Sequence, residues 1–353
     1  MSKLESNIGW TDVTANIVTG CSKVSEGCKN CYAESGTRAR VLRSQGIETW
    51  GPKGVRHPVV EFARKIRRMN GLCICDRCHM THRYEHLFIC DGENAHCTCG
   101  TGKTLRRIRL FADSNSDWLD DRWPVETLAM FLQEIYAAPN VDVQLLTKRP
   151  ENWRSRMIAL SAFFERQELP DDDEFGMWLS HWGRPYSTAP SNIWLGVSVE
   201  NQKAADERIP QLLQIPAAVR FLSCEPLLED IALPIPRGAT TDAVKFPHGF
   251  GQWSKQRQEE WCHSMARATY IARCHTPFDW VIVGGESGKN FRQVPVEAIE
   301  SVAEQCKAAG VPCFVKQDCG LLPGRQGRIP DEVWRMKQFP QPTKGAQWNL
   351  KCL

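Results

Sequence analysis

The sequence lacks a long apolar stretch. Its longest apolar runs have the length of β-strands, and its first ten residues, MSKLESNIGW, contain no apolar segment of the kind found in secretory signals. We therefore expect no membrane-spanning helix, no membrane partner and a cytoplasmic location. Internal repeats and long low-complexity runs are also missing, and with 42% hydrophobic residues the chain has the composition of an ordinary globular protein.

The chain also lacks a large excess of charge of either sign. The chain has 44 Lys and Arg residues against 41 Asp and Glu residues, which leaves a net charge of +3. A weakly basic chain neither requires nor excludes a nucleic-acid partner.

Cysteine, by contrast, is abundant. The 353 residues include 16 cysteines, three of them between residues 21 and 31 and six between residues 73 and 99. Disulfides would explain such a number in a secreted protein, whereas clustered cysteines in a reducing cytosol indicate metal or redox chemistry.

Short apolar runs that end in polar or glycine-rich turns alternate with amphipathic segments. This alternation predicts parallel βαβ units. We predict an α/β fold, a partial or complete (β/α) TIM-type barrel, with a doubly wound open sheet as the alternative. The predicted strands are 16–20, 108–111, 141–146, 193–199, 219–222, 280–283 and 312–315, and the predicted helices are 125–137, 202–213 and 296–309.

The length suits one large barrel with insertions, or two ordinary domains. Two stretches interrupt the strand–helix pattern, one rich in Cys, His and Gly and one polar with a basic balance. We assign 1–69 and 104–320 to the barrel, 70–103 to a small metal-binding insertion, 236–278 to a polar insertion and 321–353 to a C-terminal tail.

The first cysteine cluster, Cys21, Cys28 and Cys31, has the spacing C-x6-C-x2-C directly after the first predicted strand. Three cysteines in one loop can hold three irons of a 4Fe–4S cluster and leave the fourth iron open for a cofactor or substrate. Gly20 and Gly27 suit a loop that wraps tightly. A structural zinc site with a fourth ligand from elsewhere is the alternative.

Polar side chains follow the later strands, at the edge where parallel α/β folds place their sites. These residues include Ser114, Asp117, Lys148, Arg149, Ser198, Glu200, Glu225, Glu286, Lys316 and Gln317.

Several of these segments resemble the radical S-adenosylmethionine (SAM) superfamily, and in particular its spore photoproduct lyase branch. The resemblance is carried by GC…GCKNCY at 20–32, FADSNSD at 111–117, LLTK at 145–148 and GVSVEN at 196–201. The spacing usual in that superfamily is C-x3-C-x2-C, so the first gap is longer here.

A closer resemblance is to a phage- and prophage-associated family known mostly by a domain-of-unknown-function label. It implies the barrel fold and the 4Fe–4S cofactor, and a protein encoded by a phage and active in the host cell, but no substrate. The shared segments are WTD at 10–12, VTGC at 18–21, GCKNCYAE at 27–34, LTKRP at 146–150, GVSVE at 196–200, FLSCEPL at 221–227, WVIVGGESG at 280–288 and FVKQ at 314–317.

The resemblance implies that the open iron binds SAM and that an electron donor such as flavodoxin or ferredoxin drives its reductive cleavage. Ser114 and Asp117 are then candidates for the SAM amino group, or alternatively form a helix cap or Asx turn. Lys148 and Arg149 are candidates for the SAM carboxylate, or alternatively a solvated pair.

Other strand-end residues have candidate roles of the same kind. Ser198 and Glu200 are candidates for the ribose, and Glu225 and Glu286 for substrate or SAM, unless they cap the following helices. Cys224 is either a hydrogen donor to a product radical or, as a free cysteine more often is, a small buried apolar residue.

The second cysteine cluster contains two close pairs, Cys75 with Cys78 and Cys97 with Cys99, which resemble a zinc ribbon. A second iron–sulfur cluster is the main alternative. Competing ligands are Cys73, Cys90, His79 and His96, and a weaker candidate for another zinc site consists of Cys262, His263, Cys274 and His275.

Three functions follow. The first is a radical SAM enzyme that modifies, isomerises or cleaves a nucleobase in DNA, RNA or a nucleotide. The second is a radical SAM enzyme that matures a peptide or protein, and the third is a non-catalytic zinc protein that binds nucleic acid. The first draws on a basic tail that is alternatively an ordinary solvated surface: Arg325, Arg328, Arg335, Lys337, Lys344 and Lys351.

Overall fold

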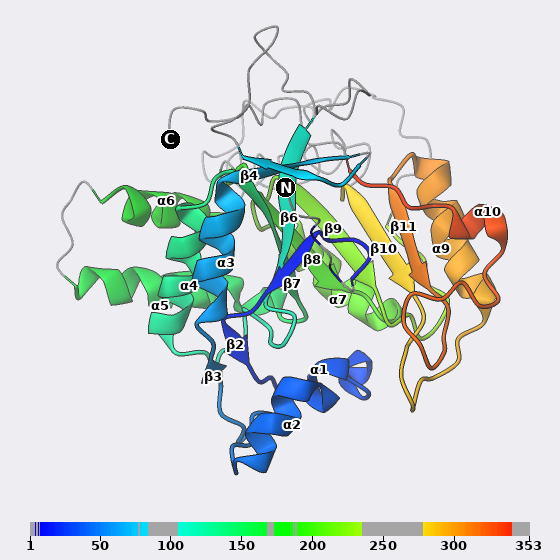
Figure 1. The fold of residues 1–353 in the computed structure, drawn as a ribbon, viewed down its shortest axis with the longest axis horizontal. Helices are drawn as coiled ribbons and strands as arrows, with labels where there is room; N and C mark the ends of the chain where they lie inside the picture. Colours follow the sequence, from blue (N-terminus) through cyan, green and yellow to red (C-terminus); the bar gives the residue numbers. More distant parts are fainter. Residues whose placement is uncertain are drawn as a thin grey trace, which may run out of the picture.

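The structure is a computed structural model that describes residues 4, 6, 8–76, 78–83, 105–167, 173–185, 187, 189–234 and 278–340. Its centre is a nine-stranded sheet (Figure 1) with seven parallel strands in the order β1-β6-β7-β8-β9-β10-β11. These strands are β1 (Val13–Ala15), β6 (Leu105–Ala112), β7 (Val141–Thr147), β8 (Ile193–Ser198), β9 (Val219–Cys224), β10 (Trp280–Gly284) and β11 (Cys313–Gln317).

Helices lie between successive parallel strands from β1 to β9 and again between β10 and β11, so the predicted α/β class and the mostly parallel sheet are confirmed. Asn201 and Asp173 accept backbone hydrogen bonds as N-caps of α7 and α6. The larger helices are α3 (Glu61–Asn70), α4 (Val125–Tyr136), α5 (Trp153–Glu165), α6 (Glu174–Trp182), α7 (Gln202–Leu212) and α9 (Val296–Ala309). Among the described residues, no helix is both long and apolar enough to cross a membrane.

The first strand differs from the prediction. In place of one strand at 16–20, the chain forms β1 and then β2 (Val18–Thr19), which pairs with β3 (His57–Pro58) in a separate small sheet. The cause is Asp113, whose Oδ1 accepts hydrogen bonds from Ile17 N and Val18 N at 3.1 Å. The chain is therefore drawn away from the sheet edge after Ala15.

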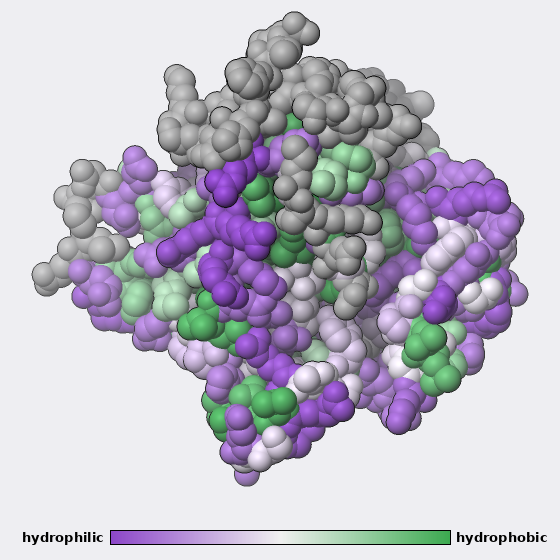
Figure 2. Space-filling model, viewed as in Figure 1, coloured by the Kyte–Doolittle hydropathy of each residue, from purple (hydrophilic) through white to green (hydrophobic). Residues whose placement is uncertain are grey.

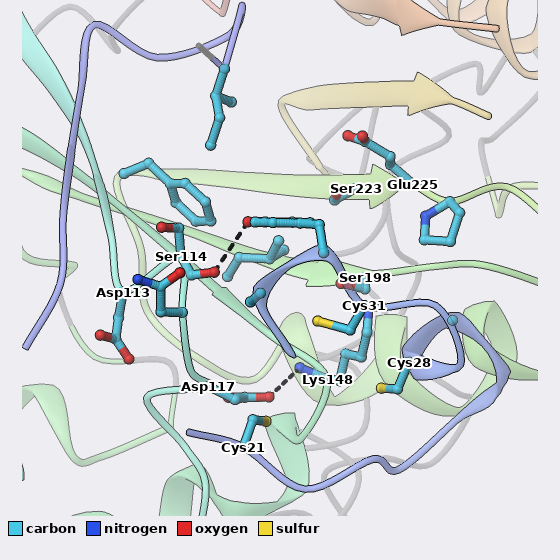
Figure 3. A pocket seen from close by; sticks show the side chains of 18 of the residues that line it. Cys21, Cys28, Cys31, Asp113, Ser114, Asp117, Lys148, Ser198, Ser223 and Glu225 are labelled. Atoms are coloured by element: carbon cyan, nitrogen blue, oxygen red, sulfur yellow. Dashed lines mark hydrogen bonds between the residues drawn. The ribbon is translucent and has the colours of Figure 1, made fainter. Parts of the chain in front are cut away.

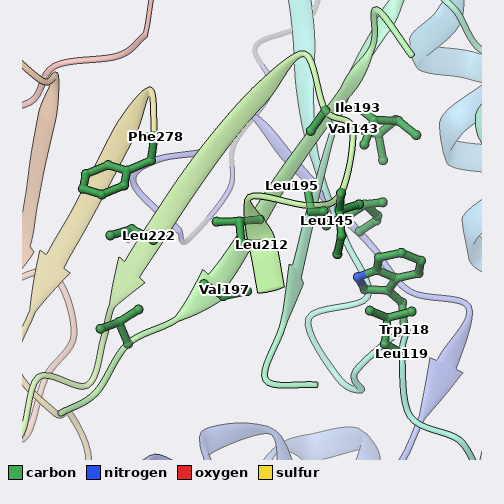
Figure 4. Close-up of a cluster of buried hydrophobic side chains, with 14 of the residues drawn as sticks. Trp118, Leu119, Val143, Leu145, Ile193, Leu195, Val197, Leu212, Leu222 and Phe278 are labelled. Atoms are coloured by element: carbon green, nitrogen blue, oxygen red, sulfur yellow. The ribbon is translucent and has the colours of Figure 1, made fainter. Parts of the chain in front are cut away.

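The outer face of the sheet packs against the helices. Residues that alternate along each strand contribute aliphatic side chains to one large core, because successive side chains point to opposite faces. Figure 4 shows this cluster with Val143 and Leu145 of β7, Leu195 of β8, Leu222 of β9 and Leu212 of α7.

The inner face carries a second, aromatic cluster, which contains the first residues of β9 and β10 and extends to Phe111 near the carboxyl end of β6. Its centre is Trp10, whose ring centroid lies 4.6 Å from that of Phe111 on β6 and 6.1 Å from that of Trp280 on β10. Strands at opposite sides of the sheet thus touch one side chain, so the sheet curves around Trp10. This cluster fills the inner face at the amino ends and leaves the carboxyl ends open.

Closure of a barrel is not shown. Among the described residues β1 and β11 do not pair with each other. The free side of β11 is instead covered by the segment after α10 (Asp331–Trp334), where Val315 N donates to Met336 O at 2.8 Å and Gln338 N donates to Cys313 O at 3.0 Å.

The beginning of the proposed tail therefore packs on the sheet, and two of its basic residues, Arg328 and Lys337, have partners within the chain. Arg328 forms an ion pair with Asp318 at 2.6 Å, and Lys337 Nζ lies 3.2 Å from the centroid of the Trp334 ring. Residues 341–353, with Lys344 and Lys351, lie outside the described residues.

The two predicted insertions are described only in part. Strand β4 (Leu72–Cys75) pairs antiparallel with β5 (Thr81–Arg83) and with β6, so the first residues of 70–103 belong to the central sheet. Residues 84–104 and 235–277 lie outside the described residues, and with them Cys262, His263, Cys274 and His275.

A close approach on the inner face generates a stability prediction. A Cβ atom at Gly196 of β8 would lie 2.3 Å from the Phe221 ring, which is held inside the aromatic cluster. We expect Gly196→Ala to lower the free energy of unfolding by about 1–3 kcal/mol, because the ring has no room to move. Gly71→Ala, where the nearest atom is 3.9 Å away, serves as the control in the same denaturant titration. Equal stability of the two variants would contradict the packing described here.

Candidate functional site

A cavity of about 600 Å³ opens at the carboxyl ends of the parallel strands. Its lining includes all three cysteines of the first cluster (Figure 3) and polar residues at the ends of six strands, β6 to β11. The predicted residues brought together here are Cys21, Cys28, Cys31, Ser114, Asp117, Lys148, Arg149, Ser198, Glu225, Glu286 and Lys316.

The cysteine loop depends on its two glycines, as the sequence predicts. Gly20 has a φ of 128°, and a Cβ atom there would lie 2.5 Å from the carbonyl oxygen of Thr49. A Cβ atom at Gly27 would lie 3.0 Å from Cδ of Glu200. The backbone therefore passes close to neighbouring segments directly before Cys21 and directly before Cys28.

The loop continues into a lobe that contains α1 (Tyr32–Ser35) and α2 (Thr37–Ser44), at the carboxyl ends of the strands (Figure 1). Cys21 and Cys31 pack against a small apolar cluster of Ala33, Ala39 and Trp50 inside this lobe. Figure 2 shows hydrophobic surface at this end of the molecule, as it does in several other places on the same face.

Arg149 and Asp117 form a buried ion pair beside Cys21. The distance between Nη1 of Arg149 and Oδ2 of Asp117 is 2.9 Å, and Nη2 of Arg149 donates to the carbonyl oxygen of Ser22 at 2.7 Å. The remaining Asp117 oxygen accepts from the Thr147 hydroxyl at 2.7 Å. Both side chains are thus committed to each other and to the loop, which differs from their expected contacts with SAM.

A second buried pair extends this network. Arg56 lies 2.7 Å from Asp120, with side chains 2% and 1% exposed, and Arg56 Nη2 also donates to the Ser22 hydroxyl at 2.6 Å. Asp120 lies 3.8 Å from Arg149, so two arginines and two aspartates form one neutral network. We call this set, Asp117, Arg149, Asp120 and Arg56, the arginine–aspartate network.

Glu286 anchors the other side of the loop. Its Oε2 accepts from the Asn30 side chain at 2.9 Å, and the Arg292 guanidinium binds both carboxylate oxygens. These hydrogen bonds outweigh the effect of burial and lower the pKa of Glu286. The carboxylate that the sequence assigns to substrate or SAM therefore holds the segment between Cys28 and Cys31.

Lys148 is the cation of the cavity that stays uncommitted. No hydrogen bond or ion pair joins its ammonium to any residue in the described part of the chain, and the residue is half-buried. Figure 3 shows it among the three cysteines. Ser198 lines the same cavity.

Glu200 lies beneath the loop rather than on the cavity wall. It is fully buried and its Oε2 pairs with Arg208 at 2.7 Å. Burial raises the pKa of Glu200, but the charges of Lys148 and Arg208 more than offset this effect, so the pKa is lowered overall. A direct contact of Glu200 with a ribose has no support in this arrangement.

Cys224 is placed on the opposite face from its sequence neighbours. Ser223 and Glu225 line the cavity, whereas Cys224 is fully buried in the outer core. Burial raises the pKa of its thiol well above the usual value, with a contribution from Cys306. The candidate role as hydrogen donor in the cavity does not fit this position, and the role of a small buried apolar residue does.

The zinc ligands predicted in the insertion are only half described. Cys75 is buried in β4 and Cys78 lies in the following turn, while Cys97 and Cys99 fall outside the described residues. Within the described ranges no group of three or more His, Cys, Asp or Glu side chains is arranged to hold a metal ion, and this finding includes Cys21, Cys28 and Cys31. The zinc site stays a prediction.

The model of one protein family, described as a protein of unknown function (DUF5131), matches residues 5–348. The chain belongs to this family. No curated protein and no solved structure matches the chain. The family match covers the cysteine loop and every strand end described above, and carries no statement about a reaction.

Several residues that build the site escape the sequence patterns. Asn30, Arg56, Asp120 and Arg292 sit in loops and act through partners distant in sequence. For Asp113 the sequence offers one local signal, its position directly before the predicted strand-end residue Ser114. In the structure its φ is 63°, in the left-handed region that few residues other than glycine adopt. Its Oδ2 is buried and accepts no hydrogen bond in the structure.

Asp113 generates a prediction about pH. Burial raises the pKa of Asp113 from 3.8 to about 8, so between these values the folded protein holds a proton that the unfolded chain has lost. The folded state therefore binds more protons, and the free energy of unfolding falls as pH rises, by up to about 1.4 kcal/mol per pH unit.

Asp113→Asn removes this titration and keeps an oxygen for Ile17 N and Val18 N. We expect the variant to gain stability relative to the wild type as pH rises from 4 to 8, measured by denaturant unfolding at each pH. Asp121, which is exposed, provides the control: the stability of Asp121→Asn relative to the wild type should not change over this pH range. A flat difference for Asp113→Asn as well would show that Asp113 is ionised in the folded protein at neutral pH.

Proposed function

We propose that this protein is a radical SAM enzyme, with a 4Fe–4S cluster held by Cys21, Cys28 and Cys31 and with a nucleobase, in DNA, RNA or a nucleotide, as its substrate. The proposal includes the fold: the curved parallel sheet is a partial (β/α) barrel of the radical SAM kind. An electron donor such as flavodoxin or ferredoxin reduces the cluster.

One observation carries the proposal: three cysteines and one unpaired lysine line the same cavity at the carboxyl ends of the strands. The three thiols form no disulfide. An all-sulfur donor set suits iron–sulfur chemistry, and a set of three leaves one iron open. Burial raises the pKa of Cys21 to about 12, so the positive charge of a metal is what would hold this sulfur as a thiolate.

Held by Cys21, Cys28 and Cys31, the cluster would supply one-electron reductive cleavage of a SAM sulfur–carbon bond, and with it the means to remove a hydrogen atom from the substrate. The chain's own residues bind and orient. The ammonium of Lys148 binds the methionine carboxylate as a point charge. Ser198 offers a hydroxyl to the ribose. Ser114 donates its hydroxyl proton to Asn16 Oδ1 at 3.1 Å, so its oxygen remains as an acceptor for the SAM amino group.

The rest of the cavity suits a flat ring with a polar edge. Trp10, Phe111 and Leu146 supply an apolar wall that excludes water, and Glu225 and Lys316 form an ion pair on the lining. A carboxylate accepts from a base N–H, while an ammonium donates to a neighbouring carbonyl or ring nitrogen. This pairing of donor and acceptor supports a nucleobase as the substrate.

The first test of the proposal is the metal content. Protein reconstituted anaerobically should carry about four irons per chain and show charge-transfer absorption. The variant Cys21→Ala/Cys28→Ala/Cys31→Ala should lose this iron, whereas Cys319→Ala, a cysteine outside the lining, should keep it. Full iron content in the triple variant would refute the cluster assignment.

The second test is SAM cleavage. Reduced protein with SAM should release methionine and 5′-deoxyadenosine, and the correct substrate among DNA, RNA and nucleotides should accelerate release. Lys148→Ala should weaken SAM binding by roughly 10- to 100-fold, because a charge-assisted hydrogen bond contributes about 1.5–3 kcal/mol. Its iron content should stay unchanged.

The exposed lysine variant Lys203→Ala controls for the loss of a positive charge and should bind SAM normally. A fully loaded cluster that never cleaves SAM with any reductant would exclude the enzymatic function. Equal SAM affinity of the two lysine variants would remove Lys148 from the site.

A further inference from the structure

The guanidinium of Arg149 directly faces the sulfur of Cys21. Its Nη1 and Nη2 lie 3.7 and 3.8 Å from Cys21 Sγ, within hydrogen-bonding distance for sulfur. Arg149 is only 5% exposed, and Cys21 is half-buried. The contact is therefore an interior one, little screened by water.

The position of Arg149 is held by three other groups. Asp117 Oδ2 accepts from Nη1 at 2.9 Å, the Ser22 carbonyl accepts from Nη2 at 2.7 Å, and Asp120 lies 3.8 Å away. A guanidinium fixed in this way has no free pair of donors for a carboxylate of SAM. Its remaining contact in the cavity is the cysteine sulfur.

Hydrogen bonds to cysteine sulfur are one of the factors that set the reduction potential of an iron–sulfur cluster. A donor, and still more a positive charge, withdraws electron density from the sulfur and stabilises the reduced cluster relative to the oxidised one. A cluster bound by a sulfur in such contact is easier to reduce than one whose sulfurs lack donors.

We propose that Arg149 is a positioning residue that holds Cys21 and raises the reduction potential of the cluster through its two N–H contacts with the sulfur. This inference rests on the proposed function, since it requires the cluster. It assigns to Arg149 a task different from binding SAM.

The arginine–aspartate network offers a matched control. Arg56 carries the same charge, pairs with Asp120 and donates to the Ser22 hydroxyl, so it anchors the same loop. The structure gives Arg56 no hydrogen bond to Cys21 among the contacts of the described residues. Loss of Arg56 thus tests the anchoring alone, and loss of Arg149 tests the anchoring together with the sulfur contact.

The experiment compares Arg149→Gln, Arg149→Lys and Arg56→Gln with the wild type, all reconstituted anaerobically as the full chain. Iron content reports anchoring, and a redox titration followed by electron paramagnetic resonance reports the potential. We expect all variants to retain less iron, and only the Arg149 variants to have a more negative potential. Arg149→Lys keeps the charge but loses the fork of donors, so its shift should be the smaller one.

The outcomes separate the two proposals. A wild-type protein that binds no iron overturns the proposed function and this inference with it. A wild-type cluster whose potential is unchanged in the Arg149 variants, or shifts equally in Arg56→Gln, overturns the inference alone. Where Arg149→Gln is too unstable to hold a cluster, the comparison of Arg149→Lys with Arg56→Gln tests the inference. A more negative reduction potential in Arg149→Lys alone supports it, and equal potentials overturn it.

Discussion

The arginine–aspartate network is the constraint on which the site depends. It joins the loop after β6, the end of β7 and the segment before β3 through side chains that are almost completely buried, and both arginines donate hydrogen bonds to Ser22 of the cysteine loop. Because a buried charge left without its partner costs about 3–5 kcal/mol, the network can exist only when all three segments are in place. The position of Cys21 relative to the sheet is thereby set by electrostatics as well as by the backbone, while Glu286 and Arg292 hold the other end of the loop through Asn30.

The aromatic cluster on the inner face determines where a cavity can form. Trp10 comes from a segment that precedes the first strand, yet it touches rings on β6, β9 and β10. The rings fill the space at the amino ends of the strands, so the space that is left lies at the carboxyl ends, where the cysteine loop arrives. The same side chains that curve the sheet therefore form the apolar wall of the cavity, and packing and site are two aspects of one arrangement.

The sequence predicts what depends on neighbours along the chain and misses what depends on neighbours in space. Helices over 125–137, 202–213 and 296–309 end within one residue of the structure, because periodicity and capping are local. The polar strand ends are also correctly brought to one edge, because parallel strands must end together. Whether Arg149 faces a ligand or Asp117 depends on a pair 32 positions apart, which no local pattern contains. The sequence does not show on which face of the sheet Cys224 lies, for a different reason. Both faces of this sheet are apolar, so the hydrophobicity of a residue does not identify the outer face.

The charges of the cavity follow from these pairings. Asp117 is neutralised by Arg149, Glu286 by Arg292 and Glu225 by Lys316, and burial favours the neutral form of Asp113 by raising the pKa of its carboxyl. Among the described residues of the lining, Lys148 is then the charge without an ion-pair partner. Burial raises the pKa of Cys31, and the charge of Lys148 opposes part of this rise. A pocket that holds three thiols and one cation favours an anionic group of limited size next to the sulfurs, since a second cation would find no carboxylate to balance it. The carboxylates so abundant in the sequence at this edge thus serve to build the pocket, and among its described lining residues they leave Lys148 as the cation without a partner.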